Sequence, residues 1–323
     1  MKIGITYDLK SDYLKKGFSD QDIAELDNES TIDHIEEALQ KLGHKTERIG
    51  HLENLMKKLL NHKKWDLVFN ICEGMYGSGR EAQVPALLDA FQIPYTFSDT
   101  FVLALTLNKA MTKRILRDFK IPTSRFCVIK DENDLGLTNY LEYPLFVKPN
   151  AEGSGKGINV NSKVHNSTEL INTCNDIWKI SPCELIAEEY LPGKEFTVGI
   201  IGSGKESELL GCMEVNFNSG EKFYSYNMKT NYEENITYTL AKKEVSDKVC
   251  KLALESWRVL GCRDAGRVDI RLDRYGEPNF IEVNPLAGLN KETSDLPILA
   301  KMNGFSYEYI IEQIIESSKK RIK

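Results

Sequence analysis

An oxygen-rich cluster of side chains is expected near the end of the chain, in residues 266–289. Asp269 lies in a first strand, and Glu282 and Asn284 stand two residues apart in a second, so that they share one face. Carboxylate and carboxamide oxygens on facing strands suit Mg²⁺, a hard cation. Arg267 falls on the same face as Asp269 and could hold an anionic group. The alternative interpretation is an amphipathic hairpin with a solvated face.

Two strands joined by a turn would position these side chains. Apolar and polar residues alternate through residues 266–272, and residues 273–276 form a turn that ends in a glycine. Residues 280–284 form the return strand. The pattern therefore predicts a β-hairpin with one apolar and one polar face.

A glycine-rich loop, residues 153–157, follows an apolar strand that ends near Lys148. Small residues let backbone N–H groups approach phosphate oxygens closely, although a mobile hairpin turn is the alternative. The loop has no GK[ST] of a Walker A motif, and no GxGxxG follows the first strand. A charge at the end of an apolar strand is costly unless it is paired. Lys148 is therefore expected to bind phosphate, or else to extend to the solvent at the sheet edge.

A further strand, residues 185–189, leaves its domain through Leu191 and turns before Glu195. Such a crossover offers backbone groups to an adenine edge and the Glu195 carboxylate to ribose hydroxyls. Spacing alone does not assign these roles.

The N-terminal hundred residues alternate between strands and helices. Residues 2–7 and 65–70 are apolar strands, and a helix is predicted from Ser30 to about residue 43. This alternation predicts a parallel sheet with helices on both faces. Ligands bind such sheets at the loops after the strands. Glu29 and the loop at residues 73–81 are therefore placed to meet a ligand, although polar loop residues are the simpler interpretation.

The remaining elements are expected in a regular order. A helix containing Lys109 precedes a second αβ unit, and a larger antiparallel sheet begins near Phe196. The predicted helices are 101–119, 132–140, 167–178, 243–260 and 307–319, and the predicted strands of the second unit are 126–129, 145–148, 158–160 and 185–189.

Composition limits the class of protein. The chain has 323 residues, which predicts roughly two or three domains. A net charge of -6 weighs against non-specific nucleic-acid binding. The seven cysteines form no CxxC pair, and no apolar run approaches membrane-spanning length. We expect reduced thiols, a cytoplasmic location, and neither a nucleic-acid nor a membrane partner.

Six motifs in order carry a family resemblance: Lys109, the VKP that contains Lys148, EGSGKG, EEYLPGKEFTV, GRVDIRLD and FIEVNP. This set resembles the ATP-grasp superfamily, and within it the D-alanine–D-alanine ligases and their relatives. The resemblance implies an α/β fold that becomes α+β in its C-terminal part. Three domains are implied: a Rossmann-like N-terminal domain (1–98), a central ATP-grasp subdomain (99–188) and a C-terminal subdomain with the hairpin (189–323).

The resemblance also implies cofactors and residue roles. ATP and two Mg²⁺ ions, for which Mn²⁺ could substitute, are the implied cofactors. The implied ATP contacts are Lys109, Lys148, Glu188, Glu189, Leu191, Glu195 and the loop glycines Gly153 and Gly155. The implied metal ligands are Asp269, Glu282 and Asn284. The implied catalytic group comprises Arg267 and the backbone N–H of Gly288 at an oxyanion, with Glu29, Ser154 and Lys229 around the substrates.

The departures from the family pattern concentrate on the amino-acid pockets. Thr230 follows Lys229 where the family has tyrosine, and Ala287 replaces a proline in a turn. The 73–81 loop replaces a histidine–glycine loop, so Glu73, Arg80 and Glu81 are candidates for substrate contacts, or else form a salt-bridged loop.

The resemblance implies a ligase that joins two small amino-acid substrates through an acylphosphate, and a homodimer. D-Alanyl-D-alanine synthesis is the leading expectation. The alternatives are a ligase of the same mechanism with other substrates, and a non-catalytic ATP-binding protein.

Overall fold

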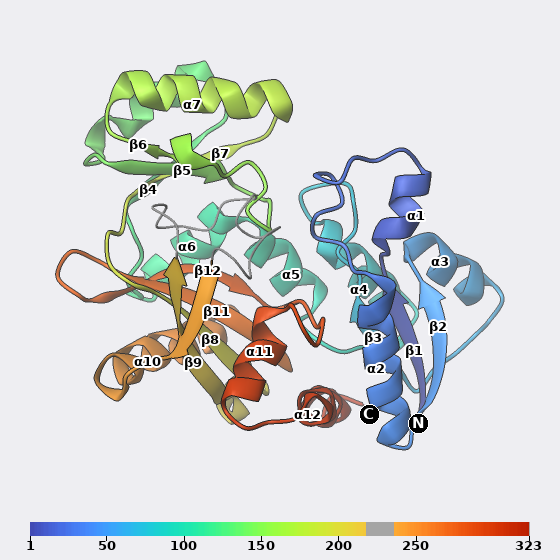
Figure 1. Ribbon diagram of the computed structural model, residues 1–323. Coiled ribbons are helices and arrows are strands. Elements are labelled where there is room, and N and C mark those ends of the chain that lie inside the picture. The colour runs from blue at the N-terminus through green and yellow to red at the C-terminus, as the bar shows by residue number, and fades with distance from the viewer. Residues whose placement is uncertain (218–235, 323) are drawn as a thin grey trace.

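The computed structural model describes residues 1–217 and 236–322, which form three groups of strands with their helices (Figure 1). In the described ranges, no helix is both long and apolar enough to cross a membrane. All seven cysteines are free thiols.

The N-terminal sheet is parallel and has the strand order β2-β1-β3. Its strands are β1 (Lys2–Tyr7), β2 (Lys45–Gly50) and β3 (Leu67–Ile71). The helices are α1 (Lys10–Lys15), α2 (Glu29–Lys41), α3 (Leu52–Leu60) and α4 (Gln83–Ala90), with a short 3₁₀ turn at Arg80–Ala82. Apolar residues of α2 pack on one face of the sheet, and those of α3 and α4 on the other. The prediction of a parallel sheet with helices on both faces is confirmed, although Asn28 and not Ser30 occupies the N-cap position of α2.

The central sheet is antiparallel, with the order β4-β7-β5-β6. Its strands are β4 (Phe126–Ile129), β5 (Leu145–Pro149), β6 (Lys163–Val164) and β7 (Leu185–Glu189). Helix α7 (Ser167–Ile180) packs against this sheet. The predicted strand at 158–160 is wrong, because the chain there runs through turns into a 3₁₀ helix, Val160–Ser162. The segment Glu132–Tyr140 is likewise a 3₁₀ helix.

The helix predicted over residues 101–119 is two helices, α5 (Thr100–Leu107) and α6 (Lys109–Asp118). Asn108 separates them with an extended backbone, and its side chain accepts a hydrogen bond from the Met111 N–H, which caps α6. Lys109 is therefore the first residue of a helix and not a mid-helix residue.

The C-terminal sheet is antiparallel, with the order β10-β9-β8-β11-β12. Its strands are β8 (Glu195–Ile201), β9 (Glu208–Phe217), β10 (Ile236–Leu240), β11 (Ala265–Leu272) and β12 (Pro278–Asn284). The accompanying helices are α10 (Lys243–Leu260), α11 (Asp295–Met302) and α12 (Tyr307–Lys319), and Gly204–Glu206 is a 3₁₀ turn. Helix α10 covers one face of the sheet through Val249, Ala253 and Trp257. The predicted hairpin is confirmed as β11 and β12.

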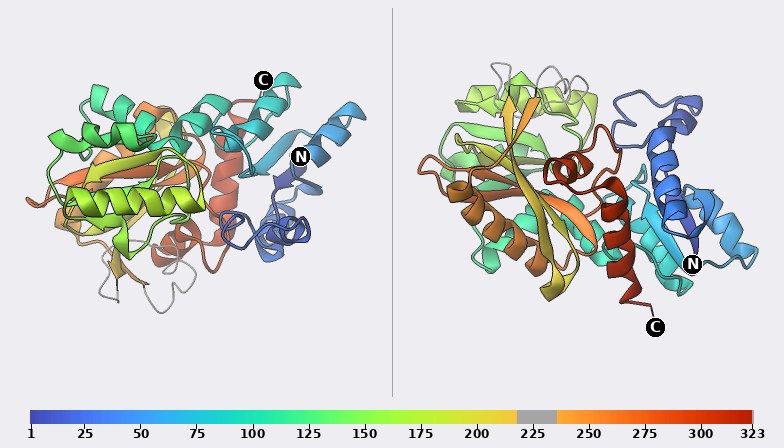
Figure 2. Two further views of the ribbon diagram at one scale, coloured as in Figure 1. Left: turned by 90° about the horizontal axis from the view of Figure 1, so that it is seen from above. Right: turned by 60° about the horizontal axis from the view of Figure 1, so that its bottom comes forward.

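Helix α12 joins the C-terminal sheet to the N-terminal domain (Figures 1 and 2). Its apolar residues share one buried cluster with α2 and β1. Next to it, the fully buried Asp264 accepts from Nη1 of Arg321 at 2.6 Å, from Nη2 at 2.8 Å, and from the Phe97 N–H at 2.7 Å. These contacts hold three distant parts of the chain together. The domain boundaries at 98/99 and 188/189 stay a prediction.

We expect Asp264→Asn to lower the free energy of unfolding by about 3 kcal/mol, because it leaves the Arg321 guanidinium without its carboxylate. Urea unfolding would measure the change. Lys248→Ala, which breaks the exposed ion pair between Lys248 and Glu277, should leave the midpoint unchanged. Equal midpoints for Asp264→Asn and wild type would show that this contact does not stabilise the fold.

Candidate active site

The polar face of the hairpin forms the centre of the site. In the antiparallel register, Asp269 stands opposite Glu282, and Arg267 stands opposite Asn284. Asp269 also receives a hydrogen bond from the Thr197 hydroxyl at 2.9 Å and pairs with the Arg267 guanidinium. The predicted arrangement, with Arg267, Asp269, Glu282 and Asn284 on one face of the hairpin, is therefore confirmed.

The oxygen atoms on the polar face of the hairpin are suitable ligands for a hard cation. Burial raises the pKa of Asp269, against the opposing charge of Arg267, and the charge of Glu282 raises it further. Two carboxylates that repel each other, with the Asn284 amide beside them, are the oxygen set that Mg²⁺ takes. In residues 1–217 and 236–322, no group of three or more His, Cys, Asp or Glu side chains is placed to hold a metal ion, and the hairpin itself offers two carboxylates and one amide.

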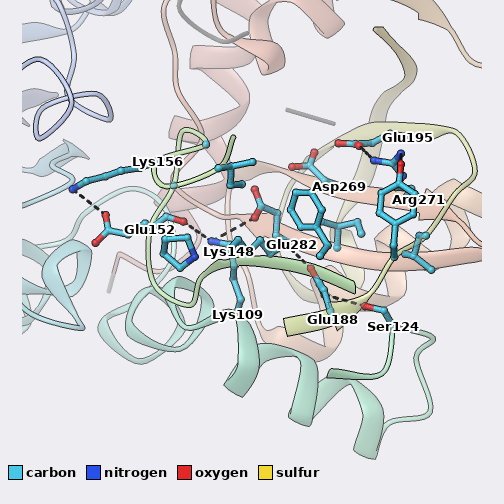
Figure 3. Close-up of a pocket in the computed structure, with 18 of the residues that line it drawn as sticks. Lys109, Ser124, Lys148, Glu152, Lys156, Glu188, Glu195, Asp269, Arg271 and Glu282 are labelled. Atoms are coloured by element: carbon cyan, nitrogen blue, oxygen red, sulfur yellow. Dashed lines mark hydrogen bonds and ion pairs between the residues drawn. The ribbon is translucent and has the colours of Figure 1, made fainter. Parts of the chain in front are cut away.

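A narrow slot lies between the central and C-terminal sheets (Figure 3). The predicted nucleotide residues line it: Lys109, Lys148, Gly153, Gly155, Glu188, Glu189, Leu191 and Glu195. Arg267, Asp269 and Glu282 form its far wall, so the slot reaches the cation-binding face. The structure brings the predicted ATP-binding residues together in one place.

Glu188 lies at the bottom of the slot between two lysines. Lys148 Nζ is 2.8 Å from its Oε1, and Lys113 Nζ is 2.8 Å from its Oε2. The Ser124 hydroxyl donates to the same Oε2 at 2.9 Å. Burial by itself would raise the pKa of Glu188, but the two ammonium groups outweigh burial and lower it to about 2.

Glu195 makes a second buried ion pair. Arg271 Nη1 lies 2.9 Å from its Oε2, and Arg271 Nη2 donates to the Tyr190 hydroxyl at 3.0 Å. Burial raises the pKa of Glu195, against the opposing charge of Arg271. Sequence reasoning missed Arg271 as a site residue, although it stands two residues after Asp269 and so shares its face of β11.

The glycine loop is fixed from two sides. Lys109 Nζ donates to the Glu152 carbonyl at 2.6 Å and lies 3.5 Å from Glu282. From the N-terminal domain, Arg80 donates to the Ala151 carbonyl at 2.8 Å and pairs with Glu25 at 2.7 Å. The Glu25 carboxylate in turn accepts from the Gly153 N–H. We call this pair the Glu25–Arg80 clamp; Arg80 is therefore a salt-bridged loop residue, the alternative that the sequence left open.

A second cavity, of about 730 Å³, opens beside the slot. Its walls include Ser154, Arg267, Asn284 and Gly288, residues for which the resemblance implies catalytic or metal-binding roles. They also include Glu25, Asp27, Glu73 and Glu81 from the N-terminal domain. Burial raises the pKa of Asp27 and that of Glu81 to about 7, and burial with the charges of Glu81 and Glu25 raises the pKa of Glu73. This cavity suits a ligand with a positively charged group.

Glu29 does not line this cavity. Its carboxylate lies 2.7 Å from Nη1 of Arg48, and its side chain is 58% exposed. The predicted substrate contact of Glu29 stays a prediction; in this structure its side chain pairs with Arg48 of β2 instead. Asp27 and Glu25, two and four residues earlier, lie at the cavity instead. Lys229 and Thr230 lie outside the described residues.

The fold and the nucleotide slot define an enzyme of the ATP-grasp superfamily. A family model described as the D-ala D-ala ligase C-terminus matches residues 115–316. The chain is 32% identical over 289 residues to D-alanine–D-alanine ligase of Thermotoga maritima, covering 88% of this chain and 90% of that protein. It is 32% identical over 283 residues to the ligase of Aquifex aeolicus, covering 87% and 92%. The chain belongs to the D-alanine–D-alanine ligase family, whose members are ATP-dependent ligases.

Solved structures agree with this assignment. The crystal structure of D-alanine–D-alanine ligase from Bacillus anthracis matches with a TM-score of 0.76 and 25% identity, over 99% of this chain and 98% of that chain. A D-Ala:D-Ser ligase from Enterococcus faecalis shares the fold, with a TM-score of 0.75 and 20% identity over 98% and 99% of the two chains. The predicted fold, superfamily and class of enzyme are confirmed.

We expect Arg80→Met to expose the glycine loop to protease, because it removes the ion pair and the hydrogen bond that hold residues 151–153. Cleavage by trypsin after Lys156, followed by fragment mass, should become several-fold faster than in wild type. Arg274→Met removes an exposed arginine paired with Glu142 at 3.4 Å and should leave that rate unchanged. An unchanged rate in Arg80→Met would mean that the clamp does not hold the loop.

Proposed function

We propose that this protein is an ATP- and Mg²⁺-dependent carboxylate–amine ligase that forms a peptide bond through an acylphosphate. One observation carries the proposal: the slot and the second cavity share a wall made of Lys109, Glu152, Gly153, Ser154, Arg267 and Glu282. A carboxylate held in the cavity would meet the terminal phosphate of a nucleotide in the slot at this wall. Phosphorylation of the carboxylate would make it a better acyl donor to an amine, because the amine nitrogen can then form the C–N bond as phosphate leaves.

The residues that line the slot and the second cavity have chemically distinct roles in this proposal. Lys109 and Lys148 would offset the negative charge of the phosphates. Asp269, Glu282 and Asn284 would hold Mg²⁺, which supplies further charge stabilisation to the transferring phosphoryl group. Arg267 and the Gly288 N–H would hold the oxyanion that forms when the amine attacks. An alanine Cβ at Gly288 would lie 2.8 Å from the Ser294 hydroxyl oxygen, so a side chain at this position would require Ser294 to shift.

Water exclusion belongs to the same proposal, because an acylphosphate exposed to water would hydrolyse. The glycine loop lies between the slot and the cavity, and the Glu25–Arg80 clamp holds it there. The clamp would therefore keep the loop over the reacting groups. We also propose a homodimer, which rests on the family resemblance alone, and a cytoplasmic location, which rests on the free cysteines.

D-Alanine is the first substrate to test on both sides of the bond, because the relatives at 32% identity are named D-alanine–D-alanine ligases. A second candidate is a ligase of the same mechanism with a different amine. The observation that favours it is the set of carboxylates at Asp27, Glu73 and Glu81, which would balance a positive charge on a substrate.

We expect Glu282→Gln to reduce substrate-stimulated phosphate release by at least about 10²-fold, because it removes one of two opposed carboxylates at the cation-binding face. Phosphate release would be measured with ATP and Mg²⁺, and thermal unfolding would show that the variant is folded. A control, Asp176→Asn, removes an exposed carboxylate paired with Lys179 on α7 and should keep wild-type turnover. Turnover near wild type in Glu282→Gln would remove the metal assignment.

A panel of D- and L-amino acids, singly and in pairs, would separate the two candidates, with product masses read directly. Phosphate release with D-alanine and a product of the mass of D-Ala-D-Ala would establish the first candidate.

If a basic amino acid is the substrate instead, Glu81→Gln should raise its KM about tenfold or more and leave kcat nearly unchanged, because the lost contact is a binding contact. An equal KM in the variant would exclude Glu81 from recognition.

A further inference from the structure

Lys113 is a fully buried lysine that the proposed chemistry does not use. Its side chain has no exposed surface, and it stands one turn after Lys109 in α6. Its ammonium group contacts Glu188 Oε2 at 2.8 Å, the Thr123 hydroxyl at 2.8 Å and the Phe280 carbonyl at 3.2 Å. Three acceptors satisfy its three N–H donors, so this group is fixed behind the slot and does not line it.

Lys148 differs from Lys113 in this respect. It pairs with the other oxygen of Glu188 at 2.8 Å, and it does line the slot. A nucleotide phosphate in the slot would compete with Glu188 for the Lys148 ammonium. Glu188, with a side chain only 5% exposed, would then be a buried carboxylate at risk of losing a counter-charge.

We propose that Lys113 is a positioning residue that keeps Glu188 ionised and in place while Lys148 turns from Glu188 to the nucleotide phosphate. This inference rests on the proposed ATP binding and goes beyond it. It assigns different roles to the two lysines that contact Glu188: Lys113 stays on the carboxylate, and Lys148 binds the phosphate. Lys113 also ties α6, the adenine-side strand β7 and the carbonyl of Phe280 in β12 into one unit. Glu188 would thereby stay fixed relative to the cation-binding hairpin.

The charged groups around Glu188 support these separate roles of Lys113 and Lys148. Lys113 faces it from α6 and Lys148 from β5, while the segment before β4 contributes the neutral Ser124 hydroxyl. Arg125 of that segment turns to Glu189, at 3.2 Å. Across the slot, Glu282 of β12 pairs with Lys109, and Glu195 of β8 pairs with Arg271. Lys113 is thus the cation that remains on Glu188 once Lys148 is engaged.

Loss of Lys113 is expected to couple nucleotide binding to the uptake of a proton by Glu188. In Lys113→Met, Lys148 alone would keep the pKa of Glu188 low in the free protein. Nucleotide binding would draw Lys148 away, and burial would then raise the pKa of Glu188 above its usual range. Binding would take up a proton, so nucleotide affinity would be highest at low pH and would fall as pH rises, by up to about tenfold per pH unit. In wild type, Glu188 would be ionised in both states and would add no proton uptake.

The experiment is calorimetric titration with a non-hydrolysable ATP analogue and Mg²⁺, between pH 5.5 and 8, in buffers of different ionisation enthalpy. Protons released or bound by the nucleotide itself are common to all variants and cancel in the difference from wild type. We expect Lys113→Met to take up close to one extra proton in the lower part of this range, and less as pH rises through the raised pKa of Glu188. Ser124→Ala removes a hydrogen bond from the same carboxylate oxygen without removing charge, and should show no extra proton.

Equal proton uptake in folded Lys113→Met and wild type would overturn the proposal, even if affinity falls. If Lys113→Met does not fold, Glu188→Gln gives an independent comparison. Wild type and Glu188→Gln should then take up the same number of protons, and one more proton in wild type would show that Lys113 does not hold Glu188 ionised. Absence of nucleotide binding by wild type would instead contradict the proposed function, so the two failures are distinguishable.

Discussion

The pairing of β11 with β12 is the constraint on which the site depends. In an antiparallel pair, directly opposite residues bring their Cβ atoms to within about 5.5 Å of each other, which is close enough for two carboxylates to share one cation. The register that sets Asp269 against Glu282 also sets Arg267 against Asn284. A one-residue slip would turn these groups into the apolar core, where Val268, Ile270 and Val283 now lie. Burial of those apolar side chains therefore fixes the chemistry on the other face.

Buried ion pairs are the second feature that shapes this molecule. Glu188 with its two lysines, and Glu195 with Arg271, are removed from water at the base of the slot. Such pairs rarely add stability over well-packed apolar groups, because desolvation costs about as much as the attraction returns. In the proposed function their value lies in binding, since a phosphate that enters the slot would meet ammonium groups that are already gathered there.

Residues of the N-terminal domain give the second cavity its acidic wall. The apolar cluster shared by α12, α2 and β1 holds that domain against the C-terminal sheet. Asp27, Glu73 and Glu81 come from loops around the first and third strands of the parallel sheet, where ligands of such sheets bind. In the proposed function, Arg267 and Glu282 would belong to the catalytic part of this cavity, and the acidic residues would recognise the substrate.

The sequence by itself determined the parts of this protein that depend on local periodicity. Alternation in residues 266–284 specified the hairpin and its polar face, and the strand that ends at Lys148 placed a charge at the slot. The strand–helix order of the N-terminal half predicted the parallel sheet. Six ordered motifs specified the superfamily. These features follow from neighbouring residues, because a strand's two-residue repeat decides which side chains share a face.

Only the tertiary structure decided the contacts between segments that are far apart in sequence. Glu25 meets the Gly153 N–H across 128 residues, and Lys113 meets the Phe280 carbonyl across 167. Spacing along the chain cannot indicate that Glu25 and Asp27, rather than Glu29, line the cavity, because the direction of the first turn of α2 is set by packing on the sheet. The same holds for Arg80, Lys113 and Arg271, whose partners come from other domains or strands. Long-range packing of the three units, and not local pattern, brings these charges together.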